Sequence, residues 1–266
     1  MPPADPENRK STIGMMTFLS NCLKAVGAAT WMHFLGARGK MRQLQSQTLQ
    51  VFPGHLAPEV CSELIERIED AISQGPHPRL WQDAAGSDTR ILGFDQDIPD
   101  ILAEFDIDNL VSAIDAYTGR RTKSWFLMAN RVVPRYQNLG SGGGWHRDSP
   151  FSHQVKCIWY LSDVGLDNGA FQYIPGTNVN LISTCRVYPL GQTRFDSIHT
   201  GEESVVANAG TLLVCDTKCI HRGRPIKSGA RYAITLYTSP KAGAIAKTFE
   251  KSGIDPRLAT KDSQMQ

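Results

Sequence analysis

Residues 145–177 read WHRDSPFSHQVKCIWYLSDVGLDNGAFQYIPGT and contain two apolar runs separated by turn-forming residues. The runs KCIWYLSDV and AFQYIPGT are rich in the aromatic and β-branched residues that favour strands. Asp167-Asn168-Gly169 separates the two runs and Pro175-Gly176 ends the second, and both are typical turn sequences. The stretch therefore predicts two short strands joined by a turn.

Strand-like sequence of the same kind fills most of the chain after Ser124, whereas the part before it has helical character. Residues 101–117 form an amphipathic pattern that ends near Gly119, and an earlier apolar stripe predicts a helix before it. Helices followed by several short strands favour a mainly β protein in which helices flank a β-sandwich or jelly roll. The earlier stripe consists of Leu64, Ile65, Ile68 and Ile72. The other predicted strands are WFLMANRVVPRY (125–136), SVVANAGTLLVCD (204–216) and RYAITLYTS (231–239).

The composition is ordinary for a globular protein. Of the 266 residues, 41% are hydrophobic and 20% are charged, and 28 basic against 26 acidic residues leave a net charge of +2. This balance leaves no large excess of basic residues to bind nucleic acid, so we expect no nucleic-acid partner. The six cysteines form no Cys-x-x-Cys pair and no signal-peptide pattern is recognised, which we interpret as reduced thiols in a cytoplasmic protein.

His146 and Asp148 are two residues apart, so on an extended backbone both side chains leave the same face. His221 follows the strand-like run TLLVCD and is the best placed third ligand among the other histidines. Two imidazoles and one carboxylate on one side of a metal leave the opposite positions open, as in non-haem Fe(II) oxygenases. The three residues therefore predict an iron site, although a His-any-Asp triplet alone also arises by chance.

Two further features surround the predicted metal ligands. Arg231 opens the strand-like run RYAITLY, where a buried arginine could bind a dicarboxylate co-substrate through two parallel hydrogen bonds. The glycine run 142–144 precedes the triplet but lacks the Gly-Lys-Ser/Thr ending of a phosphate loop. We interpret it as a flexible rim through which substrate reaches the metal, or as a plain connecting loop.

Residues 145–177, followed by GTLLVCDTKCIHRGRPIKSGARYAITLY (210–237), resemble the phytanoyl-CoA dioxygenase family of Fe(II)- and 2-oxoglutarate-dependent oxygenases. The resemblance is specific from about Trp125 to Tyr237 and looser before it. It implies a double-stranded β-helix that uses Fe(II), 2-oxoglutarate and O2. The residues that it implies are His146, Asp148 and His221 as catalytic iron ligands, with Arg231, Trp159, Met128 and Leu127 as contacts of 2-oxoglutarate.

The resemblance also shows departures from the family pattern. Two residues after the distal histidine, relatives often have a serine that helps to bind 2-oxoglutarate, whereas this chain has Gly223. Halogenating relatives have a small residue at the position of Asp148, so the carboxylate favours hydroxylation. We therefore expect a dioxygenase that hydroxylates an unactivated C–H bond of a small organic substrate and releases succinate and CO2.

Two other classes of function stay open from the residues alone. A cupin-like metal enzyme of different chemistry commonly uses more histidines and would leave Arg231 without a purpose. A non-catalytic β-sandwich that only binds a ligand would need neither iron nor all four site residues together. We expect the long segment 186–203 to act as a substrate lid, because long loops in compact domains are often functional.

The chain divides into three expected segments: an apolar and basic N-terminal extension with helical character (1–45), a double-stranded β-helix dioxygenase domain (46–245) and a C-terminal tail (246–266). Residues 13–42 have no apolar run long enough to cross a bilayer. Trp31, Phe34 and the basic residues after them would suit a helix lying on an anionic membrane surface. We favour a helix packed on the outside of the sheet or a partner contact, expect turnover without residues 1–45, and leave a peripheral membrane contact open.

Overall fold

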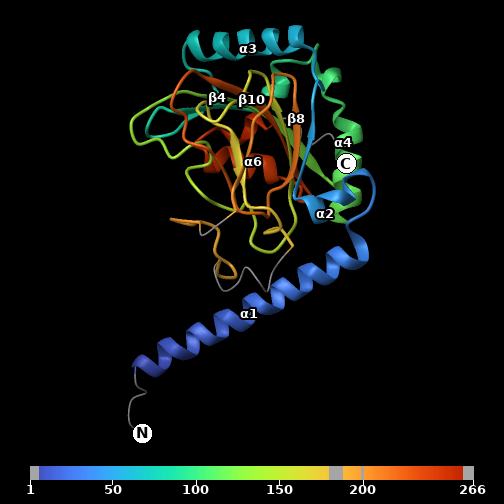
Figure 1. Cartoon of the computed structure of the whole chain (residues 1–266), viewed down its shortest axis with the longest axis vertical. Coiled ribbons are helices and arrows are strands. Elements are labelled where there is room, and N and C mark those ends of the chain that lie inside the picture. Colours follow the sequence, from blue (N-terminus) through green and yellow to red (C-terminus); the bar gives the residue numbers. More distant parts are fainter. Residues whose placement is uncertain (1–5, 180–187, 199–200, 260–266) are drawn as a thin grey trace.

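Two antiparallel β-sheets face each other and form a jelly roll, flanked by helices (Figure 1). The computed structural model describes residues 6–179, 188–198 and 201–259, with side chains from Gly14 onward. The larger sheet has the strand order β1-β8-β5-β10-β4-β3-β2 and the smaller sheet the order β7-β6-β9. The predicted mainly β fold, a double-stranded β-helix with flanking helices, is confirmed.

The strands are β1 (Leu49–Phe52), β2 (Leu80–Gln82), β3 (Asp88–Leu92), β4 (Ser124–Val132), β5 (Val155–Tyr160), β6 (Phe171–Tyr173), β7 (Glu203–Val205), β8 (Leu212–Asp216), β9 (His221–Gly223) and β10 (Arg231–Ser239). The α-helices are α1 (Pro6–Leu35), α2 (Leu44–Gln47), α3 (Pro58–Ser73), α4 (Ile107–Thr118) and α6 (Ala244–Lys251). Short 3-10 helices are η1 (Lys40–Gln43), η2 (Phe94–Gln96), η3 (Leu102–Phe105) and η4 (Pro256–Leu258).

Strand β10 runs through the middle of the larger sheet, and its two faces meet different surroundings. It pairs with β4 from Arg231 to Ser239 and with β5 on its other side. Ile234 and Leu236 are fully buried in the main hydrophobic core, whereas Ala233 and Thr235 line a cavity on the opposite face. Side chains alternate along a strand, so the larger sheet separates the core from a cavity between the two sheets.

Helices α3 and α4 cover the outer face of the larger sheet. Helix α3 begins with Pro58, which suits the first helical position because its missing N–H needs no partner there. Its stripe of Cys61, Leu64 and Ile68 is buried against the sheet, as the spacing predicts. Helix α4 ends at Gly119, whose φ of 67° is readily adopted only by glycine. The buried contacts that result hold the sheet rigid behind the cavity.

Helix α1 follows a different course from the packed helix that we expected. Its N-terminal part extends away from the body, and only its C-terminal part reaches the domain (Figure 1). Within the described residues, no helix is both long and apolar enough to span a membrane. The core continues across residue 45, because Met32, Met41 and Leu44 are buried in the same cluster as the sheet residues. The end of the expected N-terminal extension therefore contributes to the core, and turnover without residues 1–45 stays a prediction.

The segment after β10 forms helix α6 and the short turn η4. Phe249 of α6 packs edge-on against Phe126 of β4 at a ring-centroid distance of 5.7 Å. Ile245 and Ile254 complete this small apolar cluster. The beginning of the expected tail therefore belongs to the folded domain.

Leu44→Ala tests whether the N-terminal segment contributes to the core. Leu44 has no exposed surface, so its truncation should lower the free energy of unfolding by about 2–5 kcal/mol. Leu19→Ala serves as the control, because Leu19 is 53% exposed and should change stability by less than about 0.5 kcal/mol. Urea unfolding of both variants measures the difference. Equal stabilities would show that the domain begins after Leu44.

Candidate metal and co-substrate site

Backbone pairing brings the two histidines together. The N–H of His146 donates to the carbonyl oxygen of His221 at 2.9 Å, and the N–H of His221 donates back at 2.8 Å. Asp148 is fixed in the same way, because its N–H donates to the carbonyl of Thr217. His221 lies on β9, whereas His146 forms isolated bridges in an extended loop and not the regular strand that we expected. The ladder of strand hydrogen bonds is interrupted on both sides of the triplet. Gly142–Gly144 before it have positive φ angles, and Pro150 after it has no N–H to donate.

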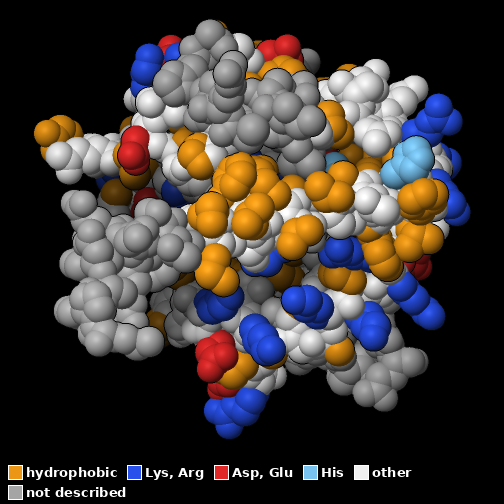
Figure 2. Space-filling view, turned by 90° about the horizontal axis from the view of Figure 1, so that it is seen from below, with side chains coloured by type: hydrophobic (Ala, Val, Ile, Leu, Met, Phe, Trp, Pro, Cys, Tyr) orange, Lys and Arg blue, Asp and Glu red, His pale blue; other side chains and the backbone are white. Residues whose placement is uncertain are grey.

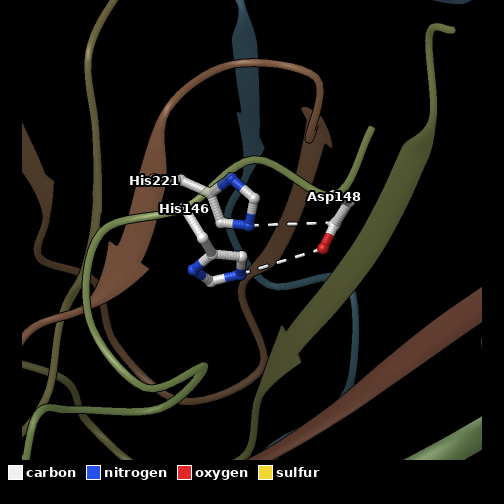
Figure 3. A group of neighbouring side chains, drawn as sticks. All are labelled: His146, Asp148 and His221. Atoms are coloured by element: carbon white, nitrogen blue, oxygen red, sulfur yellow. Dashed lines mark ion pairs between the residues drawn. The ribbon is translucent and has the colours of Figure 1, made fainter. Parts of the chain in front are cut away.

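The three side chains converge on one point at the end of the smaller sheet (Figure 3). The Nε2 atoms of His146 and His221 each lie 3.8 Å from a carboxylate oxygen of Asp148. The potential ligand atoms all lie within 4.8 Å of one another. Each Nδ1 faces a backbone carbonyl, that of Gly144 at 2.9 Å and that of Cys219 at 3.0 Å. Protonated Nδ1 atoms would donate these bonds and leave both Nε2 lone pairs directed at the site.

The protonation states suit a divalent cation. Burial lowers the pKa of His146 to about 3 and also lowers the pKa of His221, so both rings are neutral near pH 7. Burial alone would raise the pKa of Asp148, but the nearby ammonium of Lys156 holds it below its ordinary value. The Lys156 Nζ lies 2.7 Å from Asp148 Oδ2 and 4.6 Å from the ring centre of Tyr237. Two neutral imidazoles and one carboxylate form the donor set that Fe(II) takes in facial triads.

The converging side chains open onto a cavity of about 490 Å³ between the two sheets. Each strand contributes every second residue to its wall, which follows from the alternation of side chains. Apolar, aromatic and charged residues share the lining, and Arg90 and Lys156 lie over the rings of Trp81 and Tyr237. Its residues include Trp81, Asp83, Asp88, Arg90, Met128, Asn130, Lys156, Ile158, Tyr160, Phe171, Arg194, Gly223, Arg231, Thr235 and Tyr237, together with the three side chains of the cluster.

Arg231 is buried in this wall, and the structure brings it to the same cavity as the metal-site cluster. One terminal nitrogen donates to the carbonyl of Gly169 at 2.6 Å and the other to Asn130 Oδ1 at 2.8 Å. Its Nε is buried and has no hydrogen-bond partner among the described residues. A guanidinium has five N–H groups, so three of them remain for a ligand. This arrangement fixes the plane of the guanidinium and suits a carboxylate.

The structure does not bring two of the expected co-substrate contacts to the cavity. Trp159 lies in the main core, where its Nε1 donates to His55 and its ring meets Phe105 edge-on at 4.9 Å. Leu127 is buried in the same core, on the face of the sheet that points away from the cavity. The neighbours Met128 and Ile158 line the cavity instead. The error is one of strand phase, since a shift by one residue exchanges the two faces.

A serine could not replace Gly223 without rearrangement. A Cβ at this position would lie 2.8 Å from the Cβ of Ser141, so the space that a side chain would need is already taken. The Ser141 hydroxyl donates to Asp88 at 3.1 Å, and the same carboxylate pairs with Arg90. Gly223 departs from the serine that relatives often have, and Ser141 on the opposite loop takes the space that a side chain at Gly223 would need.

Sequence reasoning missed the polar residues Asp88, Arg90, Ser141 and Lys156 of the cavity wall. Asp88 and Arg90 lie on β3, a strand that was not among those predicted, and no motif marks them. Lys156 stands two residues before Ile158, so the correct phase of β5 would have identified it. The expected lid is described only in part: Arg194 pairs by backbone with His146, whereas residues 186–187 and 199–200 lie outside the described residues.

Comparison with known proteins identifies the family. The family model for phytanoyl-CoA dioxygenase (PhyH) matches residues 49–233. No match was found among curated proteins. Similar solved structures include EvdO2 from Micromonospora carbonacea var. aurantiaca, with 15% identity over 77% of this chain and 92% of that chain and a TM-score of 0.54. HygX from Streptomyces hygroscopicus, solved with nickel and 2-oxoglutarate bound, is 16% identical over 77% of this chain and 87% of its own, with a TM-score of 0.54.

A prolyl-4-hydroxylase from Pseudomonas putida shares 14% identity over 76% of this chain and 97% of that chain, with a TM-score of 0.53. At these identities the solved structures show a common fold, and the family match carries the assignment. The chain therefore belongs to the phytanoyl-CoA dioxygenase family and is an Fe(II)- and 2-oxoglutarate-dependent oxygenase.

Proposed function

We propose that His146, Asp148 and His221 hold the Fe(II) ion and that the enzyme hydroxylates a C–H bond of a small organic substrate. The convergence of their three ligand atoms within 4.8 Å is the observation that carries this proposal. When bound, iron supplies the chemistry that couples decarboxylation of 2-oxoglutarate, with release of succinate and CO2, to oxidation of the substrate by O2. Asp148 occupies the third ligand position, which favours hydroxylation over halogenation.

The residues around the ligands hold them in place before any metal binds. The two backbone carbonyls that face the Nδ1 atoms set the ring orientation, and Lys156 holds the Asp148 carboxylate from its other side. The ring of Phe171 stacks near His221 at a centroid distance of 5.5 Å, which restricts its rotation. These contacts keep the three ligand side chains from turning away to form hydrogen bonds with other protein groups.

Arg231 is the residue that we assign to the distal carboxylate of 2-oxoglutarate. It lies on the cavity wall, is fully buried, and keeps unused N–H groups after bonding Gly169 and Asn130. Desolvation lowers its pKa, yet a guanidinium stays charged near neutral pH. A dicarboxylate would supply the missing negative charge. Met128 lines the same cavity, and we assign it to a contact with the co-substrate.

The remaining cavity supports a small-molecule substrate. Ile158, Phe171 and Tyr237 give it an apolar portion, whereas Arg90 and Arg194 add positive charge near its polar side. Arg194 donates to the carbonyls of Gly142 and Gly143, so it closes one edge of the rim. We infer that the described part of segment 186–203 borders the substrate, as a partly fixed wall of the site.

Asp148→Ala tests the iron assignment. Purified wild-type protein, stripped of metal, should bind one Fe(II) per chain under anaerobic conditions, and the variant should bind it at least tenfold more weakly because one ligand is gone. Turnover of 2-oxoglutarate to succinate should be lost, while the circular dichroism spectrum stays native. Anaerobic Fe(II) titration and succinate release measure both effects. Unchanged iron affinity and activity would refute the ligand assignment.

Arg231→Ala tests the co-substrate assignment. Removing the partner of a buried carboxylate typically costs about 2–5 kcal/mol, so the apparent Km for 2-oxoglutarate should rise tens- to thousands-fold while iron still binds. Arg231→Lys should restore only part of the loss, since an ammonium cannot make two parallel hydrogen bonds. Arg222→Ala is the control, because its side chain leaves the other face of β9 and bonds Gln172. An unchanged Km in Arg231→Ala would overturn the assignment.

Gly142→Ala tests whether the glycine run positions His146. A Cβ at Gly142 would lie 2.4 Å from His146 Cε1, whereas a Cβ at Gly144 would meet nothing within 4 Å. Both glycines have a φ of 89°, so backbone strain is the same and only the contact with the histidine differs. We expect Gly142→Ala to weaken Fe(II) binding about 10–100-fold, as supporting residues of metal sites commonly do, and Gly144→Ala to have a much smaller effect. Equal titration curves would show that His146 is not positioned by Gly142.

A further inference from the structure

Helix α1 carries an apolar stripe on the side that faces away from the domain. Met15, Leu19, Leu23, Val26 and Phe34 lie on one face at helical spacing, with Thr30 between the last two. All five side chains are exposed, and the exposed fraction reaches 75% for Leu23. Met16, Phe18 and Leu35 of the same helix are also exposed. Water-exposed apolar stripes of this kind are rare in proteins that have no further partner, and they mark interaction surfaces.

Contact with the domain does not account for this stripe, because a different face of α1 makes that contact. Ala25 and Met32 are buried, and Asn21 donates through Nδ2 to the carbonyl of Leu190 at 3.1 Å. Trp31 donates through Nε1 to the carbonyl of Thr118 at 3.3 Å. Helix α1 is thus held against the body on one side and presents apolar side chains on the other.

The charged residues of the segment that carries the stripe have one sign. The sequence contains no Asp or Glu between Glu7 and Glu59. Lys24, Arg38 and Lys40 are exposed in this segment, and so is Arg42. Seen from below, the face that carries α1 shows many Lys and Arg side chains and fewer Asp and Glu side chains beside the exposed apolar ones (Figure 2). An apolar surface bordered by cations is complementary to an anionic lipid surface.

We propose that the outward face of helix α1 docks the enzyme on the surface of an anionic lipid bilayer. The helix lies in the interfacial plane with its apolar side chains between the lipids and the basic residues at the phosphate level. The contact that we propose is peripheral, and no described helix is both long and apolar enough to span a bilayer. A second copy of the chain is a poorer occupant, because two such faces would bring the same basic residues together.

Docking would also place the rim of the cavity near the lipid surface. The segment that Asn21 contacts at Leu190 continues to Arg194, which lines the cavity. Phe151, close behind the metal-ligand triplet, lies 5.9 Å from the ammonium of Lys24. The proposal itself does not depend on the oxygenase activity, since the apolar stripe and its charges lie outside the cavity.

Sedimentation of the full chain with sucrose-loaded vesicles tests the proposal. We expect the protein to sediment with vesicles that contain about a third phosphatidylglycerol and to stay largely in the supernatant with pure phosphatidylcholine, as charge attraction predicts. Binding should weaken as salt is raised towards about 1 M, where screening acts within about 3 Å. No binding to anionic vesicles at low salt would overturn the proposal.

Two sets of variants separate the apolar from the charged contribution. Leu19→Ser with Leu23→Ser should weaken vesicle binding by about tenfold or more, because each exposed leucine would otherwise be buried in the bilayer. Leu166→Ser is the matched control: Leu166 is 50% exposed, in the turn between β5 and β6, and its loss should change nothing. Lys24→Gln, Lys40→Gln and Arg42→Gln together should abolish the preference for anionic lipid.

Iron titration and melting temperature show whether the variants keep the native fold, since none of these residues lies in the core. Sedimentation velocity addresses the rival occupant. A dimer that Leu19→Ser with Leu23→Ser dissociates, without vesicle binding by the wild-type protein, would assign the face to a second copy and refute membrane docking. Equal vesicle binding by the leucine variant and its control would refute it as well.

Discussion

The reciprocal backbone hydrogen bonds between His146 and His221 join two distant segments of the chain at the point where the sheets close. Through β9 and its neighbour β6, this bridge ties the glycine-rich loop to the smaller sheet. The ring nitrogens then find backbone carbonyls of Gly144 and Cys219, which belong to the same two segments. Loss of this pairing would move two residues of the candidate metal cluster at once, so the proposed site depends on a main-chain contact that tolerates variation in the surrounding side chains.

The cavity wall concentrates charged groups in a buried place, which is costly for folding. Asp148 and Lys156 satisfy each other, and Asp88 pairs with Arg90, but Arg231 has no acidic partner within hydrogen-bonding distance in the described part of the chain. An isolated buried cation destabilises a protein unless neighbouring dipoles or a ligand compensate it. Asn130 and the Gly169 carbonyl supply dipoles, and a bound dicarboxylate would supply the charge. The buried charge of Arg231 thus lowers the stability of the unliganded protein, and ligand binding would restore that stability.

The sequence was sufficient to predict the jelly roll and the residues that the structure brings together as a metal cluster, because both follow from short-range patterns and one distant histidine. It was not sufficient to set the phase of β5. Val155–Tyr160 is buried on both faces of the sheet, so apolar and polar residues do not alternate, and nothing local distinguishes Ile158 from Trp159. Only the pairing of Trp159 with Ile234 of β10 places it in the core. Asp88 and Arg90 were not predicted for a related reason, since their role depends on which strand lies beside them.

The N-terminal segment shows how one stretch of chain can serve two environments. Met32 and Leu44 belong to the core and tie the segment to the domain, whereas Leu19 and Leu23 are left in water. A helix that only covered the sheet would place its apolar residues on one side, so periodicity would predict its packing. Here apolar residues occur on two opposite sides, and the pattern alone cannot show which of them meets the domain. Asn21 determines which side of the helix meets the domain, because its amide needs a partner and donates to the Leu190 carbonyl beside the rim of the cavity.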